Sequence, residues 1–250
     1  GEHGVRVDAL SGRDGRLIHA LSGFAVDALF GEVVAAAGDV DADGTPDILV
    51  GAPFVDGNGI DSGAAYVFSG KTGGLLRRIP GEAPFDHFGK ELASAGDVNG
   101  DGFADLFIGA PDHDSAGTNA GRAYVLSGRD GSLVYLFDGE TPHASFGAAV
   151  AAVGDLNADG WEDLAIGAPN DSSAGANFGR LRLVNGRNGN TLYTLDGQAT
   201  GVRFGQSVSA LGDVDGDGRA DFVVGAPRDA GCGGVPSGTA SIRSGVDGAP

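Results

Sequence analysis

The apolar residues of the chain fall in short runs of five or six, separated by segments rich in glycine and aspartate. Between residues 88 and 145, these runs cover 91–96, 104–108, 122–126 and 133–137. Runs of this length that end in Gly, Pro or Asp predict β-strands. The run at 104–108 is almost continuously apolar, which predicts a strand buried on both faces. We therefore expect four short strands in this stretch and an all-β fold.

The same pattern returns every 58 residues. Each period opens with Phe-Gly, its second strand ends at Gly-Ala-Pro, and a short glycine-containing turn separates its third and fourth strands. Phe-Gly occurs at 30–31, 88–89, 146–147 and 204–205, and Gly-Ala-Pro at 51–53, 109–111, 167–169 and 225–227. A fixed period of this size predicts stacked units, and four-stranded antiparallel sheets at a regular period are typical of a β-propeller.

We expect one domain across residues 1–250. Its repeats cover about 30–87, 88–145, 146–203 and 204–250, and two strands within 5–21 precede them. These two strands, 5–10 and 16–21, match only the third and fourth strands of a period, whereas the C-terminal end supplies a first, second and third strand. Two explanations are open: a ring closed by strand exchange between the termini, or a fragment of a larger propeller. The number of blades stays open with them.

An acidic loop joins the first two strands of every period. In the first period, Asp39, Asp41, Asp43 and Asp47 occupy positions 1, 3, 5 and 9 of this loop. Ca²⁺ takes six to eight oxygen ligands in a flexible shell, and alternate residues of a tight loop can turn several carboxylates toward one point. Glycine at position 6 allows the sharp turn, and position 7 would offer its backbone carbonyl.

Four such loops in register predict about four Ca²⁺ ions per chain. The alternative, a solvated acidic turn without an ion, does not require converging carboxylates. Asn replaces Asp at position 3 of two loops, so these two should bind the ion somewhat more weakly. The predicted metal ligands are Asp39, Asp41, Asp43, Thr45 and Asp47; Asp97, Asn99, Asp101, Phe103 and Asp105; Asp155, Asn157, Asp159, Trp161 and Asp163; and Asp213, Asp215, Asp217, Arg219 and Asp221.

The net charge of −18 narrows the choice of partners. Nucleic acid is excluded because phosphate binding needs a basic surface, and no apolar run is long enough to insert into a membrane. The single cysteine, Cys232, rules out an intrachain disulfide. Loops of this kind usually bind Ca²⁺ weakly and need the millimolar concentrations found outside cells. We therefore expect an extracellular or cell-surface protein, with Ca²⁺ as its structural staple.

An up-and-down order of strands divides the loops between two faces. The acidic loops and the hairpin turns should share one face. The loops at 54–62, 112–120, 170–178 and 228–237 should share the opposite face with the segments before each Phe-Gly. The four phenylalanines are expected to pack between sheets. For Trp161, at loop position 7, shielding of the ion and an exposed contact are alternatives, and a packing role is favoured. A transition-metal site at Asp112, His113 and Asp114 is a weaker alternative to a solvated loop.

The motifs together resemble the FG-GAP repeat. Phe-Gly, then Asp-x-Asp/Asn-x-Asp-Gly-x-x-Asp, then Gly-Ala-Pro recur over nearly the whole chain. The FG-GAP repeat builds the propeller of integrin α subunits and of many bacterial secreted proteins. The resemblance implies that Ca²⁺ sits in the hairpin between the first two strands of a blade. It also implies that ligands dock on the opposite face.

The resulting hypothesis is an extracellular calcium-binding propeller that acts as an adhesion or ligand-binding scaffold for a protein or glycan. No catalytic residue stands out from the repeat, so we do not expect an enzyme. Two alternatives are kept: a polysaccharide-active enzyme, since some polysaccharide lyases are similar propellers, and a structural spacer of a larger surface protein. A homo-oligomer is also compatible with the sequence.

Overall fold

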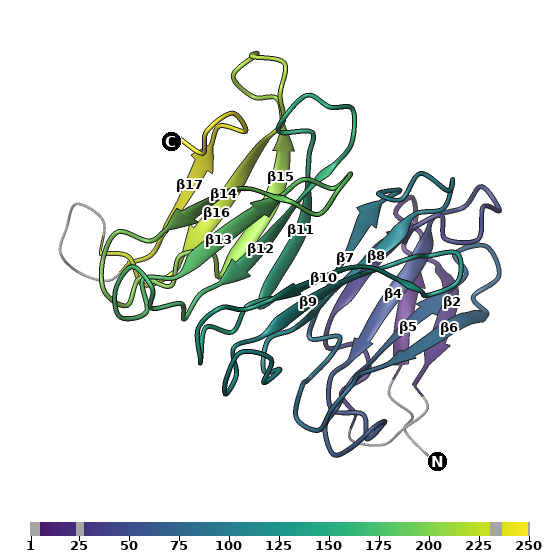
Figure 1. The fold of residues 1–250 in the computed structure, drawn as a ribbon. Helices are drawn as coiled ribbons and strands as arrows, with labels where there is room; N and C mark the ends of the chain where they lie inside the picture. Colours follow the sequence, from purple (N-terminus) through teal and green to yellow (C-terminus); the bar gives the residue numbers. More distant parts are fainter. Residues whose placement is uncertain (1–5, 24–27, 231–236, 250) are drawn as a thin grey trace.

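The structure, a computed structural model, describes residues 6–23, 28–230 and 237–249. All the regular secondary structure in these ranges is β-strand, as predicted. The first sheet is a pair, and three four-stranded sheets and one three-stranded sheet follow it along the chain (Figure 1). Their strands are β1 (Arg6–Leu10) and β2 (Leu17–Ser22); β3 (Val34–Gly38), β4 (Asp47–Ala52), β5 (Ala64–Phe68) and β6 (Leu75–Pro80); β7 (Glu91–Gly96), β8 (Asp105–Ala110), β9 (Arg122–Leu126) and β10 (Leu133–Asp138); β11 (Ala149–Gly154), β12 (Asp163–Ala168), β13 (Arg180–Val184) and β14 (Thr191–Asp196); and β15 (Ser207–Gly212), β16 (Asp221–Ala226) and β17 (Thr239–Arg243).

Each four-stranded sheet is antiparallel, with its strands in chain order. The first strands of successive sheets lie next to each other, β3 beside β7, β7 beside β11 and β11 beside β15. This is the arrangement of blades in a propeller, and it confirms the predicted fold class. Strand β8 ends two residues later than predicted, because it includes Gly109 and Ala110 and stops before Pro111.

The hydrophobic core lies between the sheets. Successive residues of β8 point to opposite faces, so Leu106 and Ile108 pack toward the preceding sheet whereas Phe107 packs toward the following one. All three side chains are fully buried. The second strands are therefore covered on both faces, as their continuous apolar pattern predicts.

The phenylalanines of the four Phe-Gly motifs are packing anchors, as predicted. Each is at least 94% buried and belongs to one of the cores between sheets. The glycine that follows donates a backbone hydrogen bond to the glycine of Gly-Ala-Pro in its own sheet, at 2.8–3.1 Å. The phenylalanine amide donates to the preceding sheet, for example from Phe88 to Ser62 O at 3.1 Å. Phe-Gly therefore ties each sheet to its neighbour through both backbone and side chain.

The two ends of the row of sheets differ from its middle. β1 and β2 pair with each other and pack through Leu21 against the β3–β6 sheet. At the other end, β15–β17 form a sheet of three strands among the described residues, without a strand from the N-terminal segment. Figure 1 shows these two sheets at opposite ends of the row. Strand exchange between the termini, one of the two predicted explanations, is not the arrangement in this structure.

Candidate metal sites and the opposite face

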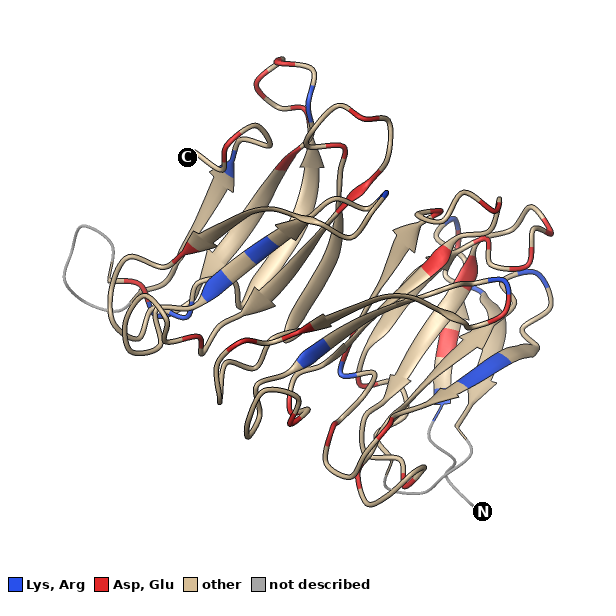
Figure 2. Cartoon of the chain, viewed as in Figure 1, with Lys and Arg blue, Asp and Glu red and all other residues tan. Residues whose placement is uncertain are grey.

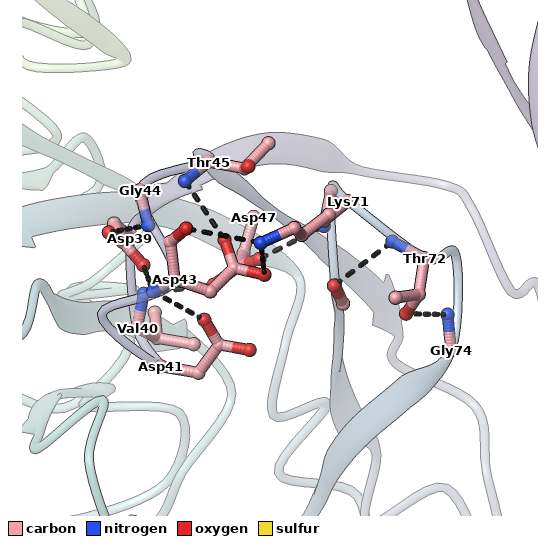
Figure 3. Close-up of polar contacts among 12 residues, drawn as sticks. Asp39, Val40, Asp41, Asp43, Gly44, Thr45, Asp47, Lys71, Thr72 and Gly74 are labelled. Carbon is pink, nitrogen blue, oxygen red and sulfur yellow. Dashed lines mark hydrogen bonds and ion pairs between the residues drawn. The ribbon is translucent and has the colours of Figure 1, made fainter.

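The acidic loop from Asp39 to Asp47 is held by its own side chains (Figure 3). The Asp39 carboxylate accepts hydrogen bonds from the amides of Asp43 at 3.1 Å and Gly44 at 2.9 Å. Asp41 accepts from the same Asp43 amide, and Asp43 accepts from the Thr45 amide at 2.9 Å. Gly44 has φ +84° with open space around its Cα, so the backbone conformation, not crowding, calls for glycine there.

The other three loops repeat these contacts. In each, the position-1 carboxylate accepts from the position-6 glycine amide at 2.8–2.9 Å, and the position-5 carboxylate accepts from the position-7 amide at 2.8–3.1 Å. Asn99 and Asn157 accept from the position-5 amide through their side-chain oxygens, as Asp41 does. Asparagine can therefore replace aspartate at position 3 without changing the loop.

The aspartate at position 9 of each loop has a different role, because it joins the loop to the hairpin turn. Asp47 accepts from the Val40 amide in its own loop and from the Gly70 amide in the β5–β6 turn, both at 2.9 Å. Asp105, Asp163 and Asp221 make the same pair of contacts in their sheets. All four carboxylates are at least 99% buried. The acidic loops and hairpin turns therefore share one face, as predicted.

Burial also changes the acidity of these aspartates. Removal from water raises the pKa of both Asp105 and Asp163 to about 6, against the opposing effect of their backbone hydrogen bonds. The pKa of Asp47 is raised for the same reason, with a smaller contribution from Asp41 and Asp39. In the absence of a cation, these carboxyls therefore hold their protons more tightly than in an unfolded chain.

Carboxylate oxygens converge most closely in the first and last loops. Ligand atoms of Asp39, Asp41 and Asp43 lie within 4.8 Å of one another, as do those of Asp213, Asp215 and Asp221. Asp47 and Asp217 do not belong to these close groups. An all-oxygen set of this kind suits a hard divalent cation such as Ca²⁺. Figure 3 also shows Lys71 reaching over from the β5–β6 turn, with its ammonium 3.8 Å from Asp43.

Neighbouring acidic loops are in contact through their positions 7 and 8. The amides of Ala104 and Ala220 donate to the carbonyls of Asp39 and Asp155, the first residues of the preceding loops, at 2.9 and 3.1 Å. Trp161 packs on the preceding loop so closely that a Cβ on Gly100 would lie 2.9 Å from its ring. Trp161 is therefore a packing residue, the favoured prediction, and it packs against the preceding loop rather than over its own.

The Arg219 side chain makes the corresponding contact in the last loop. Its guanidinium donates to Leu156 O in the preceding loop at 2.7 Å. Together with the Trp161 contact, this means that the side chains at position 7 link the loops to one another.

The opposite face holds a polar hollow of about 230 Å³. Its lining comes from residues next to the Phe-Gly motifs and from the ends of Gly-Ala-Pro and the residues after them, and it includes Lys90, Glu91, Asp112, Asn170, Arg203 and Gln206. Glu91, Arg203 and Gln206 were not among the site residues predicted from the sequence. The available signal was their position, because the residues flanking each Phe-Gly change from repeat to repeat while the motif does not.

The possible transition-metal site at residues 112–114 does not form. Asp112 faces His87, with Oδ2 2.7 Å from Nδ1. His113 faces Glu82 and Asp86 instead, at 3.6 and 3.8 Å. Asp114 accepts from the Asn119 amide within its own loop. The three side chains diverge, so this hypothesis was wrong. Cys232 lies outside the described residues.

Four-stranded antiparallel blades, with an acidic loop between the first two strands of each, define an FG-GAP type of propeller. The FG-GAP repeat model matches residues 30–68, 88–126, 146–184 and 204–242. The chain belongs to the FG-GAP repeat family.

The chain is also similar to integrin α subunits. It is 35% identical to integrin alpha-5 of Xenopus laevis over 216 residues, and 32% identical to integrin alpha-V of Gallus gallus over 206 residues. These matches cover 80% and 76% of the chain but only 20% and 19% of the relatives. The chain thus spans about a fifth of the length of these relatives.

Solved structures show a more distant likeness. The rhamnogalacturonan lyase YesW aligns over 89% of this chain and 44% of its own, with 16% identity and a TM-score of 0.48. The described part of the chain contains no helix with the length and apolar character needed to cross a membrane.

Proposed function

We propose that the protein is an extracellular, calcium-stabilised ligand-binding module that docks a protein or glycan on the face opposite its acidic loops. The observation that supports this most is a difference between the two faces. The acidic loops keep one side-chain pattern in all repeats, and their carboxylates are bonded to backbone amides. On the opposite face, polar side chains line a hollow and differ between repeats.

In this proposal, Ca²⁺ has a structural role. When bound, the ion would neutralise carboxylates that otherwise repel one another across a few ångströms. The residues that would hold it are the side chains at positions 1, 3, 5 and 9 and the carbonyl at position 7. They restrain the hairpins and, through position 9, the turns between third and fourth strands. Membership of a family that includes extracellular receptors supports the proposed location.

Figure 2 shows acidic residues in the loops at both ends of the strands. Acidic residues gather in the loops, whereas most basic residues on strands lie on β6, β9 and β13, among them Arg77, Arg122 and Arg182. Several of these arginines pair with acidic residues of the segments before Phe-Gly: Arg122 with Glu82 at 2.9 Å and Arg182 with Glu140 at 2.6 Å. Two of the segments before Phe-Gly are thus linked to the sheets by ion pairs.

Binding to defined probes tests this function. Purified protein at millimolar Ca²⁺ is applied to an array of glycans and an array of purified extracellular-matrix proteins. We expect at least one ligand, whose binding is reduced by Arg203→Ala and unchanged by Arg13→Ala. Arg13 is an exposed arginine in the β1–β2 turn and serves as the control. Absence of any ligand on both arrays, or equal binding by the two variants, would contradict the proposal.

One observation favours the enzymatic alternative. Burial raises the pKa of Glu91 to about 7, with the Glu32 charge adding to the effect, and Glu91 lines the hollow beside Lys90. A carboxyl with a pKa near neutrality is suited to general acid–base chemistry. Incubation with acidic polysaccharides, followed by detection of shortened chains, tests this alternative, and loss of cleavage in Glu91→Gln would support it.

A further inference from the structure

The hollow on the opposite face owes its shape to the third repeat. Its floor includes Ser145 and Ala148, which flank Phe-Gly in that repeat, whereas the corresponding positions of the second and fourth repeats carry longer side chains. Lys90 and Gln206 occupy the position of Ala148, and Arg203 occupies the position of Ser145. Small residues between two sets of long ones leave a space that is walled on two sides.

The side chains of the two walls differ in how far they are already paired. Asp112 accepts from His87 at 2.7 Å, from Asn119 at 3.1 Å and from Lys90 at 3.4 Å, so its charge and that of Lys90 offset each other. In contrast, Glu91, Arg203 and Gln206 form no side-chain hydrogen bond within residues 6–23, 28–230 and 237–249. These three groups can bind a ligand without first breaking an internal contact.

Asn170 adds a fixed polar group to the lining. Its side-chain nitrogen donates to Ser145 Oγ at 3.0 Å, and its backbone amide donates to Ala144 O at 3.2 Å. These two bonds fix the amide plane, and its side-chain oxygen remains able to accept. The hollow therefore combines the carboxyl of Glu91, the guanidinium of Arg203 and the side-chain amides of Asn170 and Gln206. Each of these groups is planar and forms its hydrogen bonds in its own plane.

The distribution of charge limits what kind of ligand fits. A purely cationic ligand would meet Arg203, and a purely anionic one would meet Glu91 and Asp112. A ligand with several hydroxyl groups can satisfy both walls, because each hydroxyl donates one hydrogen bond and accepts up to two. The volume of about 230 Å³ has room for a single sugar ring and not for a folded segment of protein.

We propose that this hollow binds one hydroxyl-rich sugar residue of a glycan, held between Glu91 on one wall and Arg203 and Gln206 on the other. This assignment rests on the proposed function, since it names the ligand class of the same face. The alternative is a surface cleft that holds only water. The left-handed backbone at Ser145 and Arg203, with φ of 54° and 57°, does not decide between the two, because Leu29 and His87 share it in the other repeats.

Substitutions that fill or strip the hollow test the assignment. The probes are an array of neutral and acidic glycans and, in solution, methyl glycosides of the common hexoses observed by saturation-transfer NMR. We expect binding by the unaltered protein in Ca²⁺. Ala148→Leu, which fills the floor, and Gln206→Leu, which removes hydrogen-bonding groups, should each weaken it at least tenfold. Arg13→Leu, a matched change on the exposed β1–β2 turn, should leave it unchanged.

The possible outcomes separate this inference from the proposed function. Unchanged glycan binding in both hollow variants would overturn the inference, because the glycan site would then lie elsewhere. Binding of a matrix protein without binding of any glycan would also overturn it while leaving the proposed function in place. Absence of every ligand would overturn both. Equal melting temperatures of the variants and the unaltered protein show that a loss of binding does not come from unfolding.

Discussion

The acidic-loop face and the hollow face are made by the same repeats, yet their side chains are used in opposite ways. Around Asp39, Asp43 and Asp47, every carboxylate accepts backbone hydrogen bonds, and the same contacts recur in all four loops. On the hollow face, Glu91, Arg203 and Gln206 form no side-chain hydrogen bond in the described part of the chain, and the residues at their positions differ between repeats. Positions that hold the backbone are restricted in residue type, whereas positions that only border a space are free to change.

Among the tests of this comparison, removal of calcium should have the largest effect, because it acts on the stability contributed by the acidic-loop face. An ion that binds only the folded chain stabilises it by about 2.7 kcal/mol per site when its free concentration is 100 times Kd. We expect EGTA to lower the melting temperature in calorimetry by many degrees and Ca²⁺ to restore it. Mg²⁺ should restore it poorly because it prefers a stiffer octahedral shell. An unchanged melting temperature in EGTA would contradict the calcium sites.

Two substitutions within one loop separate the metal-binding role from the structural role. Asp47→Ala leaves the buried amides of Val40 and Gly70 without their acceptor, so it should cost about 2–5 kcal/mol even in EGTA. Asp41→Ala removes an exposed carboxylate, so it should cost less than about 0.5 kcal/mol in EGTA. In Ca²⁺ both should lose one bound ion. Equal costs in EGTA, measured by urea denaturation, would show that position 9 is not a structural brace.

The dependence of stability on pH should differ with and without calcium. In protein freed of Ca²⁺ beforehand and kept in calcium-free buffer, the folded-state pKa values of Asp105 and Asp163, about 6, lie above the usual value of 3.8. The folded protein then binds more protons than the unfolded chain, so the free energy of unfolding should fall as pH rises from about 4 to 6. Saturating Ca²⁺ should reverse this trend, because the ion binds the ionised carboxylates. Urea denaturation of Asp105→Asn and Asp163→Asn, which should flatten the curve measured in calcium-free buffer, is the check.

The contact between loops predicts a smaller effect on metal affinity. Trp161 packs on the loop that begins at Asp97, so Trp161→Ala should weaken that site roughly fivefold, at the lower end of typical coupling between sites. Calorimetric Ca²⁺ titration measures this change. Terbium luminescence gives a second measurement, since Trp161 is the sole tryptophan and should sensitise an ion in the preceding loop. Asp97→Ala should reduce that emission, and full emission in Asp97→Ala would contradict the assigned contact.

Substitution of Lys71 should have the smallest of these effects on stability and Ca²⁺ affinity. Its side chain is 58% exposed and its ammonium lies 3.8 Å from Asp43, and an exposed pair of this kind contributes about 0–1 kcal/mol. Lys71→Ala should change the stability in EGTA by less than about 0.5 kcal/mol. It should also raise the Ca²⁺ affinity of the first loop slightly, because a competing cation is gone. Weaker Ca²⁺ binding in the variant would show that Lys71 supports the site.

The repeat, the strands and the acidic loops could all be predicted from the amino-acid sequence. Phe88, Asp97 and Gly109 recur at one spacing. A residue that makes the same local contact in every repeat is recognisable because the same residue type returns at that position. The burial of β8 on both faces was also predictable, since its apolar run lacks the alternation of a strand with one wet face.

The contacts between groups distant in sequence could not be predicted and became visible only in the folded chain. It placed the Gly70 amide on Asp47, Trp161 over the neighbouring loop, and Glu91 across the hollow from Arg203. It also separated His113 from Asp112, although the two are adjacent in the chain. The physical reason is that a repeat fixes contacts within one sheet and with the next, whereas the side chains that border an open space are not constrained by either.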